Sequence, residues 1–318
     1  MFAVIQQAVE CVLSLFLIGL VGYVLDKRGW FGEDTKIMLP RLVTLITLPP
    51  YLFSNVVGTF NHDDLIHLVY GAAVPAASIT LTFLAGSLMS KFMKKPEGRS
   101  GLFRTGIVAS NTIFIGIPIN IALFGEEALP YVLLYFFANT TFFWTIGNYL
   151  LSLDGGNTVK EGVFSRASLK RIFSPPLMGF AVGLLFIMLG LRVPDFIMDA
   201  AGYIGGLTTP LAIIFIGITL AGVNFRQIRL DRDVLMLIFG RFIISPATII
   251  LLMRFVELPP LMAKVFIIQA SLPVVSSAVL MAGYYRSDKE YASVVVSLTT
   301  LMSLITIPLA MVVISLMP

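Results

Sequence analysis

Ten segments of the sequence are apolar over about the twenty residues that a helix needs to cross the hydrocarbon core of a bilayer. Short connections rich in glycine, proline, asparagine and charged residues separate these segments. The alternation predicts an all-α integral membrane protein with ten transmembrane helices. The expected spans are 4–25, 38–57, 65–90, 103–124, 129–151, 172–190, 197–221, 233–253, 261–283 and 291–316.

Two of these spans are interrupted by polar residues and proline near their middle. The fourth contains the run from Ala109 to Pro118, and the ninth contains the run from Gln269 to Pro273. Proline removes a backbone donor, and carbonyls freed inside a bilayer are tolerated only where they face protein or a wet cavity. We therefore expect two broken helices whose matched positions in the two halves of the chain mark a binding site.

The composition excludes a water-soluble fold. Hydrophobic residues make up 57% of the chain and charged residues 13%, whereas a soluble domain carries about 25% charged residues. Cys11 is the single cysteine, so an intramolecular disulfide cannot form. The net charge of +4 follows from membrane topology, and no nucleic-acid partner is expected.

The distribution of Lys and Arg predicts the orientation of the chain, because these residues are retained on the cytoplasmic side. The odd-numbered connections and their flanks hold eighteen of the 22 basic residues, whereas the opposite face has Arg192, Arg254 and Lys264. We expect a multi-pass protein of the cell inner (plasma) membrane with both termini outside the cytoplasm.

The longest polar stretch divides the predicted spans into five plus five. It predicts a first repeat over 1–151, a cytoplasmic linker over 152–171 and a second repeat over 172–318. An odd number of spans in each half makes any internal repeat an inverted one. Short colinear matches support the repeat: Thr47-Leu48-Pro49-Pro50 with Thr208-Thr209-Pro210, Ala109-Ser110 with Ala270-Ser271, and Gly19 and Gly22 with Gly179 and Gly183.

Motifs in three spans resemble those of the auxin efflux carrier family. The fourth span carries Ser110 to Ile119 followed by Ala122 to Glu127, the seventh carries Gly206 to Ala212 with Gly217 to Ala221, and the ninth carries Gln269 to Pro273 with Ala282, Tyr284 and Tyr285. The resemblance extends over essentially the whole chain. Bacterial members are associated with malate, malonate and related carboxylates, and plant members carry indole acetate.

The resemblance implies an architecture and a mechanism. The plant auxin carriers and the bile acid/sodium symporter fold are similar, with inverted five-helix repeats and broken fourth and ninth helices that cross at mid-membrane. Spans 1, 2, 6 and 7 would form a scaffold, and spans 3–5 and 8–10 a transport unit that moves the substrate as an elevator. Members of the family form homodimers. The long hydrophilic loop of the long plant carriers is missing here.

The residues beside the breaks are candidates for substrate binding. A helix that starts at mid-membrane presents N–H groups and the positive end of its dipole, which favours an anion such as a carboxylate. Asn111 and Thr112 offer an amide and a hydroxyl there, although such groups also bond neighbouring helices. The other candidates are Pro118, Gln269, Ser271, Pro273, Ser276 and, from the second span, Asn55.

Arg241 is a further candidate, because it lies eight residues after Asp233, ~12 Å inside the eighth span. An arginine at that depth faces a cavity or a partner. It could hold the substrate anion, satisfy backbone carbonyls released by a helix break, or extend to the cytoplasmic interface.

Together these features predict a secondary active carrier for small organic anions and no enzyme. The two histidines do not form a His-Glu-x-x-His metal motif, and no phosphate-binding glycine loop is present, so no metal or cofactor is expected. Coupling to H⁺ or Na⁺ stays open. The alternatives are a passive channel or uniporter for small solutes, and an efflux carrier for auxin-like aromatic carboxylates.

Overall fold

The computed structural model describes residues 2–59, 64–93, 98–156, 162–163, 166–222 and 230–317. Within these ranges the chain is helical, and its β-structure is limited to one isolated bridge. In the first half, the helices are α1 (Phe2–Lys27), α2 (Glu33–Leu42), η1 (Val43–Thr47), α3 (Leu48–Thr59), α4 (Asp64–Phe92), α5 (Ser100–Val108), η2 (Thr112–Gly116), α6 (Ile117–Phe124), η3 (Glu126–Ala128), α7 (Leu129–Phe142), η4 (Phe143–Gly147) and α8 (Asn148–Asp154).

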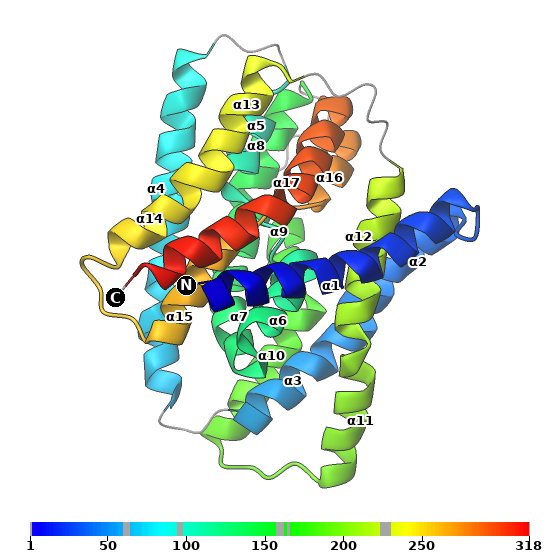
Figure 1. Cartoon of the computed structure of the whole chain (residues 1–318), viewed down its shortest axis with the longest axis vertical. Coiled ribbons are helices and arrows are strands. Elements are labelled where there is room, and N and C mark those ends of the chain that lie inside the picture. Colours follow the sequence, from blue (N-terminus) through cyan, green and yellow to red (C-terminus); the bar gives the residue numbers. More distant parts are fainter. Residues whose placement is uncertain are drawn as a thin grey trace.

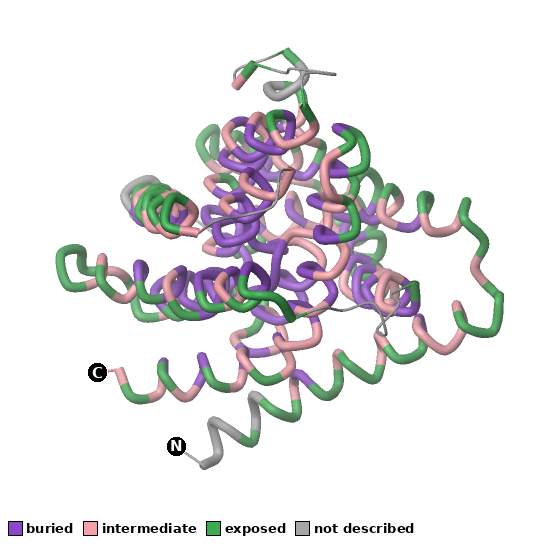
Figure 2. The backbone as a smooth tube through the Cα atoms, turned by 90° about the horizontal axis from the view of Figure 1, so that it is seen from above, coloured by how far each residue is buried: buried purple, intermediate pink, exposed green. Residues whose placement is uncertain are grey.

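The second half continues in the same manner (Figure 1). Its described helices are α9 (Arg166–Ile172), α10 (Pro175–Met188), α11 (Asp195–Gly206), α12 (Thr208–Ala221), α13 (Arg232–Phe239), η6 (Gly240–Ile244), α14 (Ser245–Leu252), α15 (Pro260–Ala270), α16 (Ser277–Tyr285) and α17 (Lys289–Ser315). The two ends of the chain lie near each other in both views of the backbone (Figures 1 and 2).

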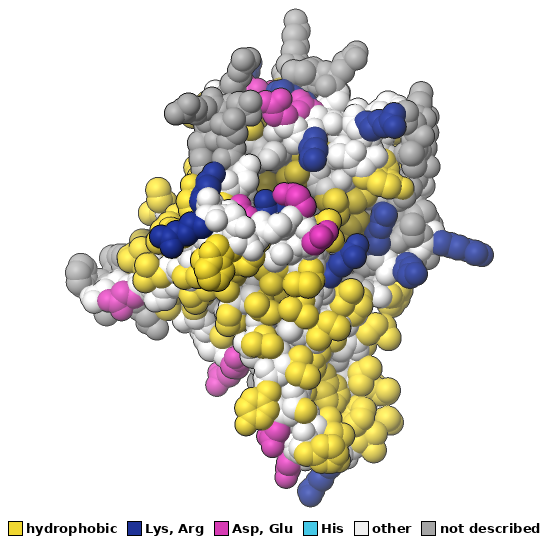
Figure 3. All heavy atoms as spheres, turned by 90° about the vertical axis from the view of Figure 1, so that its right-hand side faces the viewer, with side chains coloured by type: hydrophobic (Ala, Val, Ile, Leu, Met, Phe, Trp, Pro, Cys, Tyr) yellow, Lys and Arg dark blue, Asp and Glu magenta, His cyan; other side chains and the backbone are white. Residues whose placement is uncertain are grey.

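Seven helical segments of the described chain are long and apolar enough to cross a membrane. They are Val9–Lys27, Glu33–Thr59, Gly71–Phe92, Glu126–Asp154, Asp195–Ala221, Arg232–Leu252 and Lys289–Ser315. Shorter apolar helices, Thr112–Phe124, Pro175–Met188 and Pro260–Ala270, lie within the other three predicted spans. The prediction of an all-α membrane protein is confirmed. Hydrophobic side chains cover much of the lower part of the surface in Figure 3.

Both predicted helix breaks are present, but the first lies earlier than proline alone would put it. Helix α5 ends at Val108 and η2 begins at Thr112, so the break is Ala109–Asn111. Pro118 lies just after the π-helical turn η2 inside the continuous helical segment Thr112–Phe124, so it does not interrupt that helix. The expectation that Pro118 itself interrupts the helix is therefore corrected. In the ninth span the break does contain Pro273, between Ala270 and Ser277.

The two breaks pair with each other as a short antiparallel bridge between Ser110 and Val274. The Asn111 N–H donates to the Pro273 carbonyl at 2.9 Å, and the Val275 N–H donates to the Ala109 carbonyl at 3.0 Å. Four half-helices therefore meet at one crossover, and backbone groups that a helix would have paired are satisfied across it.

The helices pack as two groups around this crossover. In one group, α1 packs on α12, which it crosses in Figure 1, and α3 packs on α10 and α11. In the other group, α4 packs on α5, α7 and α14, while α17 packs on α15 and α16. The groups contact each other, since α17 also packs on α1. Buried residues are concentrated in the middle of the molecule, where the broken helices lie (Figure 2).

Glycines allow the closest helix contacts of the first group. A Cβ atom on Gly217 of α12 would overlap the carbonyl oxygen of Gly19 on α1, and one on Gly22 would overlap that of Ile214. On α10, a Cβ atom on Gly179 would overlap the carbonyl oxygen of Pro49. Small residues permit such backbone approach, which gives membrane helices their packing contacts.

Replacing Gly217 with valine is expected to separate α1 from α12 and to destabilise the protein by ~1–3 kcal/mol, the usual cost of overpacking. The matched control is Gly202→Val on the preceding helix α11, where an added Cβ atom meets nothing within 4 Å. Thermal unfolding of both purified variants in detergent checks this. Equal melting temperatures would contradict the assigned contact.

Candidate functional site

A cavity of about 320 Å³ lies at the crossover, on the side where the second half of each broken helix begins. Asn111, Thr112 and Ser276 line it, so the structure brings together three of the residues singled out from the sequence. The remaining lining comes from the second, fourth, fifth, sixth and ninth predicted spans and the linker: Thr44, Leu45, Ile113, Phe114, Phe136, Asn139, Thr140, Phe143, Trp144, Lys170, Arg171, Ser174, Pro175, Val275 and Ser277.

Two helix N-termini face this cavity. The segment η2–α6 begins at Thr112, and α16 begins at Ser277; neither preceding residue caps its helix with a side-chain hydrogen bond. The first N–H groups of a helix have no partner within it and carry a partial positive charge. Between the two termini, the Asn111 Nδ2 donates to the Ser276 Oγ at 2.8 Å. This end of the cavity is suited to an anion.

Two basic residues line the cavity as well. Lys170 is exposed, and the Arg171 guanidinium lies 4.9 Å from the centre of the Trp144 ring, a cation–π distance. No Asp or Glu occurs among the described residues of the lining. The described lining thus carries two basic side chains and no carboxylate.

A side chain of the fifth predicted span, Asn139, hydrogen-bonds the backbone of the first break. The Ser110 N–H donates to the Asn139 Oδ1 at 2.8 Å, and the Asn139 Nδ2 donates to the Ser110 carbonyl at 3.0 Å. The side-chain amide thus pairs both backbone groups of a residue that has left the helix. The two residues are 29 positions apart, so their pairing depends on a tertiary contact.

Arg241 does not line the cavity. It contacts the C-terminal ends of α5 and α15, the half-helices that precede the two breaks. Its side chain is 0% exposed. Nη1 donates to the carbonyls of Ile107 at 2.8 Å and Val108 at 2.6 Å, at the end of α5. Nη2 donates to the Ala270 carbonyl, at the end of α15, and to the Ser245 Oγ at 2.8 Å. These contacts agree with the alternative in which Arg241 satisfies backbone carbonyls released by a helix break. Because the side chain is fully buried, it does not extend to the cytoplasmic interface.

The other predicted residues lie around the cavity rather than in its wall. Gln269 is 0% exposed, and both polar atoms of its side chain are without a hydrogen-bond partner in the described structure. The Ser271 hydroxyl donates to the Ile267 carbonyl at 2.8 Å, and the Pro273 carbonyl accepts from Asn111. Asn55 donates to the Glu126 Oε2 at 3.0 Å, and Pro118 is buried in α6.

Lys170, Arg171 and Trp144 are among the lining residues that the sequence analysis did not single out. The basic pair was counted only as a topology signal of the linker. Its position directly before the sixth span was the available clue. Across the described ranges, no group of three or more His, Cys, Asp or Glu side chains is placed to hold a metal ion.

Comparison with known proteins identifies the family. A profile described as "membrane transport protein" matches residues 7–311. The chain belongs to the membrane transport protein family. This confirms the resemblance to the auxin efflux carriers.

Several transporters are similar to this chain, two of the following three over almost their whole length. An "uncharacterized transporter" of Methanothermobacter thermautotrophicus is 28% identical, covering 96% of this chain and 98% of that protein. A "putative malonate transporter" of Rhizobium meliloti is 23% identical, covering 62% of each chain. The "uncharacterized transporter YfdV" of Escherichia coli is 21% identical, covering 93% of this chain and 94% of that protein. The chain is thus a multi-pass membrane transporter.

Replacing Arg241 with methionine is expected to prevent stable folding. The change leaves three buried carbonyls without their donor, at ~1–3 kcal/mol each, which is a large part of a typical ~5–15 kcal/mol of total stability. Arg241→Lys keeps a charge and three donors and should retain more stability. Size-exclusion profile and thermal unfolding measure the difference. If Arg241→Met were as stable as the parent protein yet bound no anion, Arg241 would be a substrate ligand.

Proposed function

We propose that this transporter is a secondary active carrier for small organic anions and that the crossover cavity binds them. One observation carries the proposal: two helix N-termini, the Asn111 amide and two basic residues surround a cavity whose described lining has no carboxylate. The positive ends of helix dipoles and the two cations stabilise an anion without a fully buried counter-charge.

Malate, malonate or another small carboxylate fits the donor set best. The Asn111 amide and the Thr112 and Ser276 hydroxyls line one end of the cavity, and Lys170 and Arg171 contribute charge to the same lining. The relative named as a malonate transporter supports this class. A second candidate is an aromatic carboxylate of the auxin type, because Phe114, Phe136, Phe143 and Trp144 also line the cavity.

We further propose ten transmembrane helices in two inverted repeats, 1–151 and 172–318, joined by the linker 152–171. Residues matched from the sequence support this arrangement by their contacts. The Thr208 hydroxyl donates to the Thr47 hydroxyl at 2.9 Å, as expected for equivalent residues beside a two-fold axis. Gly19 and Gly22 pack α1 on α12, and their counterparts Gly179 and Gly183 pack α10 on α3.

Transport is proposed to proceed by an elevator movement. We assign spans 1, 2, 6 and 7 to a scaffold and spans 3–5 and 8–10 to a transport unit, and the packing of α1 on α12 and of α4 on α5, α7 and α14 supports this division. Both helix breaks belong to the transport unit, so the site moves intact. Polar contacts between the units include Tyr51 and Asn55 with Glu126, at 2.7 and 3.0 Å, and the Cys11 thiol with the Ala122 carbonyl at 3.1 Å.

The remaining parts of the proposal concern the cellular setting. The carrier is a homodimer of the plasma membrane, its termini lie outside the cytoplasm, and it draws energy from a gradient of H⁺, Na⁺ or a second anion. A passive channel or uniporter is the competing mechanism. Counterflow in proteoliposomes separates the two, because only a carrier exchanges labelled substrate against an unlabelled excess with saturation.

Asn111→Ala is expected to abolish the thermal shift that malonate or malate gives the purified transporter, because the amide that faces the anion is removed. Asn55→Ala is the matched control, since Asn55 binds Glu126 and does not line the cavity. The shift should persist in the control. A shift that survives Asn111→Ala, with intact folding, would remove this residue from the site.

The elevator movement predicts that a cross-link between the units stops exchange. In a Cys11→Ser background, the pair Asn55→Cys and Glu126→Cys should block counterflow when oxidised and release it when reduced. The control pair is Ser78→Cys and Thr248→Cys, whose hydroxyls lie 2.6 Å apart within the transport unit. Counterflow that continues through the oxidised first pair would argue for a static pathway.

A further inference from the structure

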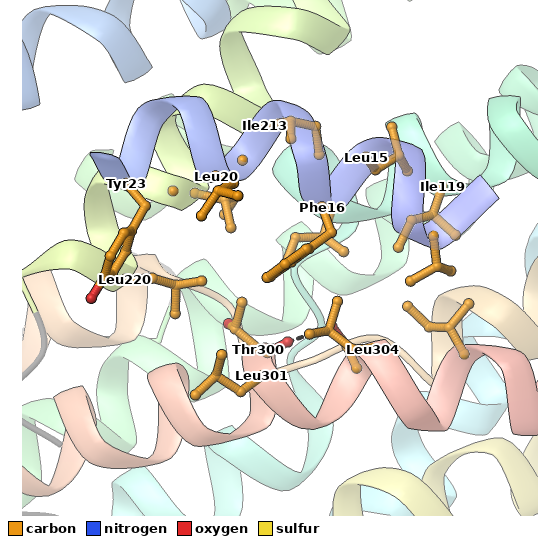
Figure 4. A pocket seen from close by; sticks show the side chains of 17 residues that line it. Leu15, Phe16, Leu20, Tyr23, Ile119, Ile213, Leu220, Thr300, Leu301 and Leu304 are labelled. Atoms are coloured by element: carbon orange, nitrogen blue, oxygen red, sulfur yellow. Dashed lines mark hydrogen bonds between the residues drawn. The ribbon is translucent and has the colours of Figure 1, made fainter. Parts of the chain in front are cut away.

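A second cavity, of about 290 Å³, lies between the pair α1–α12 and helix α17 (Figure 4). Its wall is almost entirely apolar, with Phe16, Leu20, Leu220 and Leu304 among the side chains that point into it. The two hydroxyls on α17 are already satisfied, because Thr300 donates to the Val296 carbonyl at 2.7 Å and Ser303 donates to the Thr300 carbonyl at 2.6 Å. A carboxylate has no partner here, and such a cavity is a poor site for water.

The cleft is about as long as half the thickness of a hydrocarbon core. Along α1 it extends from Val12 to Tyr23, a path of ~16 Å, compared with about 30 Å for the whole core. Helices α1 and α17 are both candidate membrane spans. Phe16 and Leu20 point into the cleft and yet are 38% and 40% exposed, so the cleft is open to the surroundings of α1.

One end of the cleft is basic. Tyr23 lies at this end in Figure 4, and the Lys27 Nζ is 5.8 Å from the centre of its ring. Lys27 and Arg28 are exposed, and Trp30, 73% exposed, follows them in the position of an interfacial aromatic residue. The neighbouring acid Asp26 contacts Lys36 at 3.4 Å. A phosphate at this level is attracted by the end of α1.

We propose that the cleft binds an acyl chain of an anionic phospholipid whose phosphate contacts Lys27. The chain fills the apolar volume between α1, α12 and α17, and the head group lies beside the basic end of α1. Because α1 and α12 belong to one packing group and α17 to the other, the lipid contacts elements of both groups beside the direct contact of α1 with α17. The inference rests on the cleft alone and does not depend on the transported substrate.

Native mass spectrometry of the purified full chain tests the head-group contact. With phosphatidylglycerol and phosphatidylcholine of identical acyl chains, we expect one retained lipid and a preference for phosphatidylglycerol. Lys27→Gln should reduce that preference about fivefold, equal to the ~1 kcal/mol that one basic residue contributes near an anionic surface. Lys264→Gln, an exposed lysine on α15, is the control and should leave the preference unchanged. Equal binding of both lipids to the parent protein would overturn the anionic assignment.

Filling the cleft tests the acyl-chain site. Leu20→Trp and, independently, Leu304→Trp should lower the retained lipid at least tenfold, because both side chains point into the cavity. Leu17→Trp is the matched control on α1, since Leu17 is 62% exposed and does not line the cleft. Two independent variants are used so that the test still stands if one of them does not fold.

The same spectra decide between occupants. The proposal is falsified if the filled variants retain as much lipid as the parent protein does. It also fails if these variants change the oligomeric mass and not the amount of lipid, because that result would assign the cleft to a second copy of the chain. Glycerol 3-phosphate should give no adduct. An adduct with this head group alone would overturn the role of the acyl chain.

Discussion

The crossover depends on a single buried cation that binds the C-terminal ends of two half-helices. Arg241 donates to carbonyls of Ile107, Val108 and Ala270, where α5 and α15 stop inside the protein. Each of these ends carries partial negative charge and unpaired acceptors, which hydrocarbon cannot satisfy. The antiparallel bridge and the Asn139 amide pair the remaining groups of the first break. Because these backbone groups are hydrogen-bonded, the broken helices are stable inside the protein, where unpaired backbone groups would be costly.

This arrangement also separates charge across the crossover. The negative helix ends face Arg241, and the positive ends, at Thr112 and Ser277, face the cavity. The cation is used within the protein, so the proposed anion site relies on dipoles, neutral donors and the peripheral Lys170 and Arg171. Such a site holds its ligand without a buried ion pair, whose desolvation would be costly. This is physically reasonable for a carrier, which must release its substrate as readily as it binds it.

The candidate site was only partly predictable from the sequence. Asn111, Thr112 and Ser276 stood out because polar residues beside a break in an apolar span have few other uses, and all three line the cavity. Arg241, Gln269, Ser271 and Asn55 stood out by the same polarity, yet they lie outside its wall. Polarity in a membrane span signals that a partner exists. It does not say whether that partner is a backbone carbonyl, a neighbouring helix or a ligand.

By itself the sequence determined the all-α membrane class, the approximate positions of the apolar helices, and the family, because these follow from the hydrocarbon thickness and from local motifs. It also marked both breaks, although proline misplaced the first by several residues. The tertiary structure decided which helix ends meet and which polar groups are used up in joining them. The pairing of Asn139 with Ser110 joins residues 29 positions apart, and that of Arg241 with Val108 joins residues 133 positions apart. Contacts at such separations arise only when the whole set of helices is packed, so no local pattern records them.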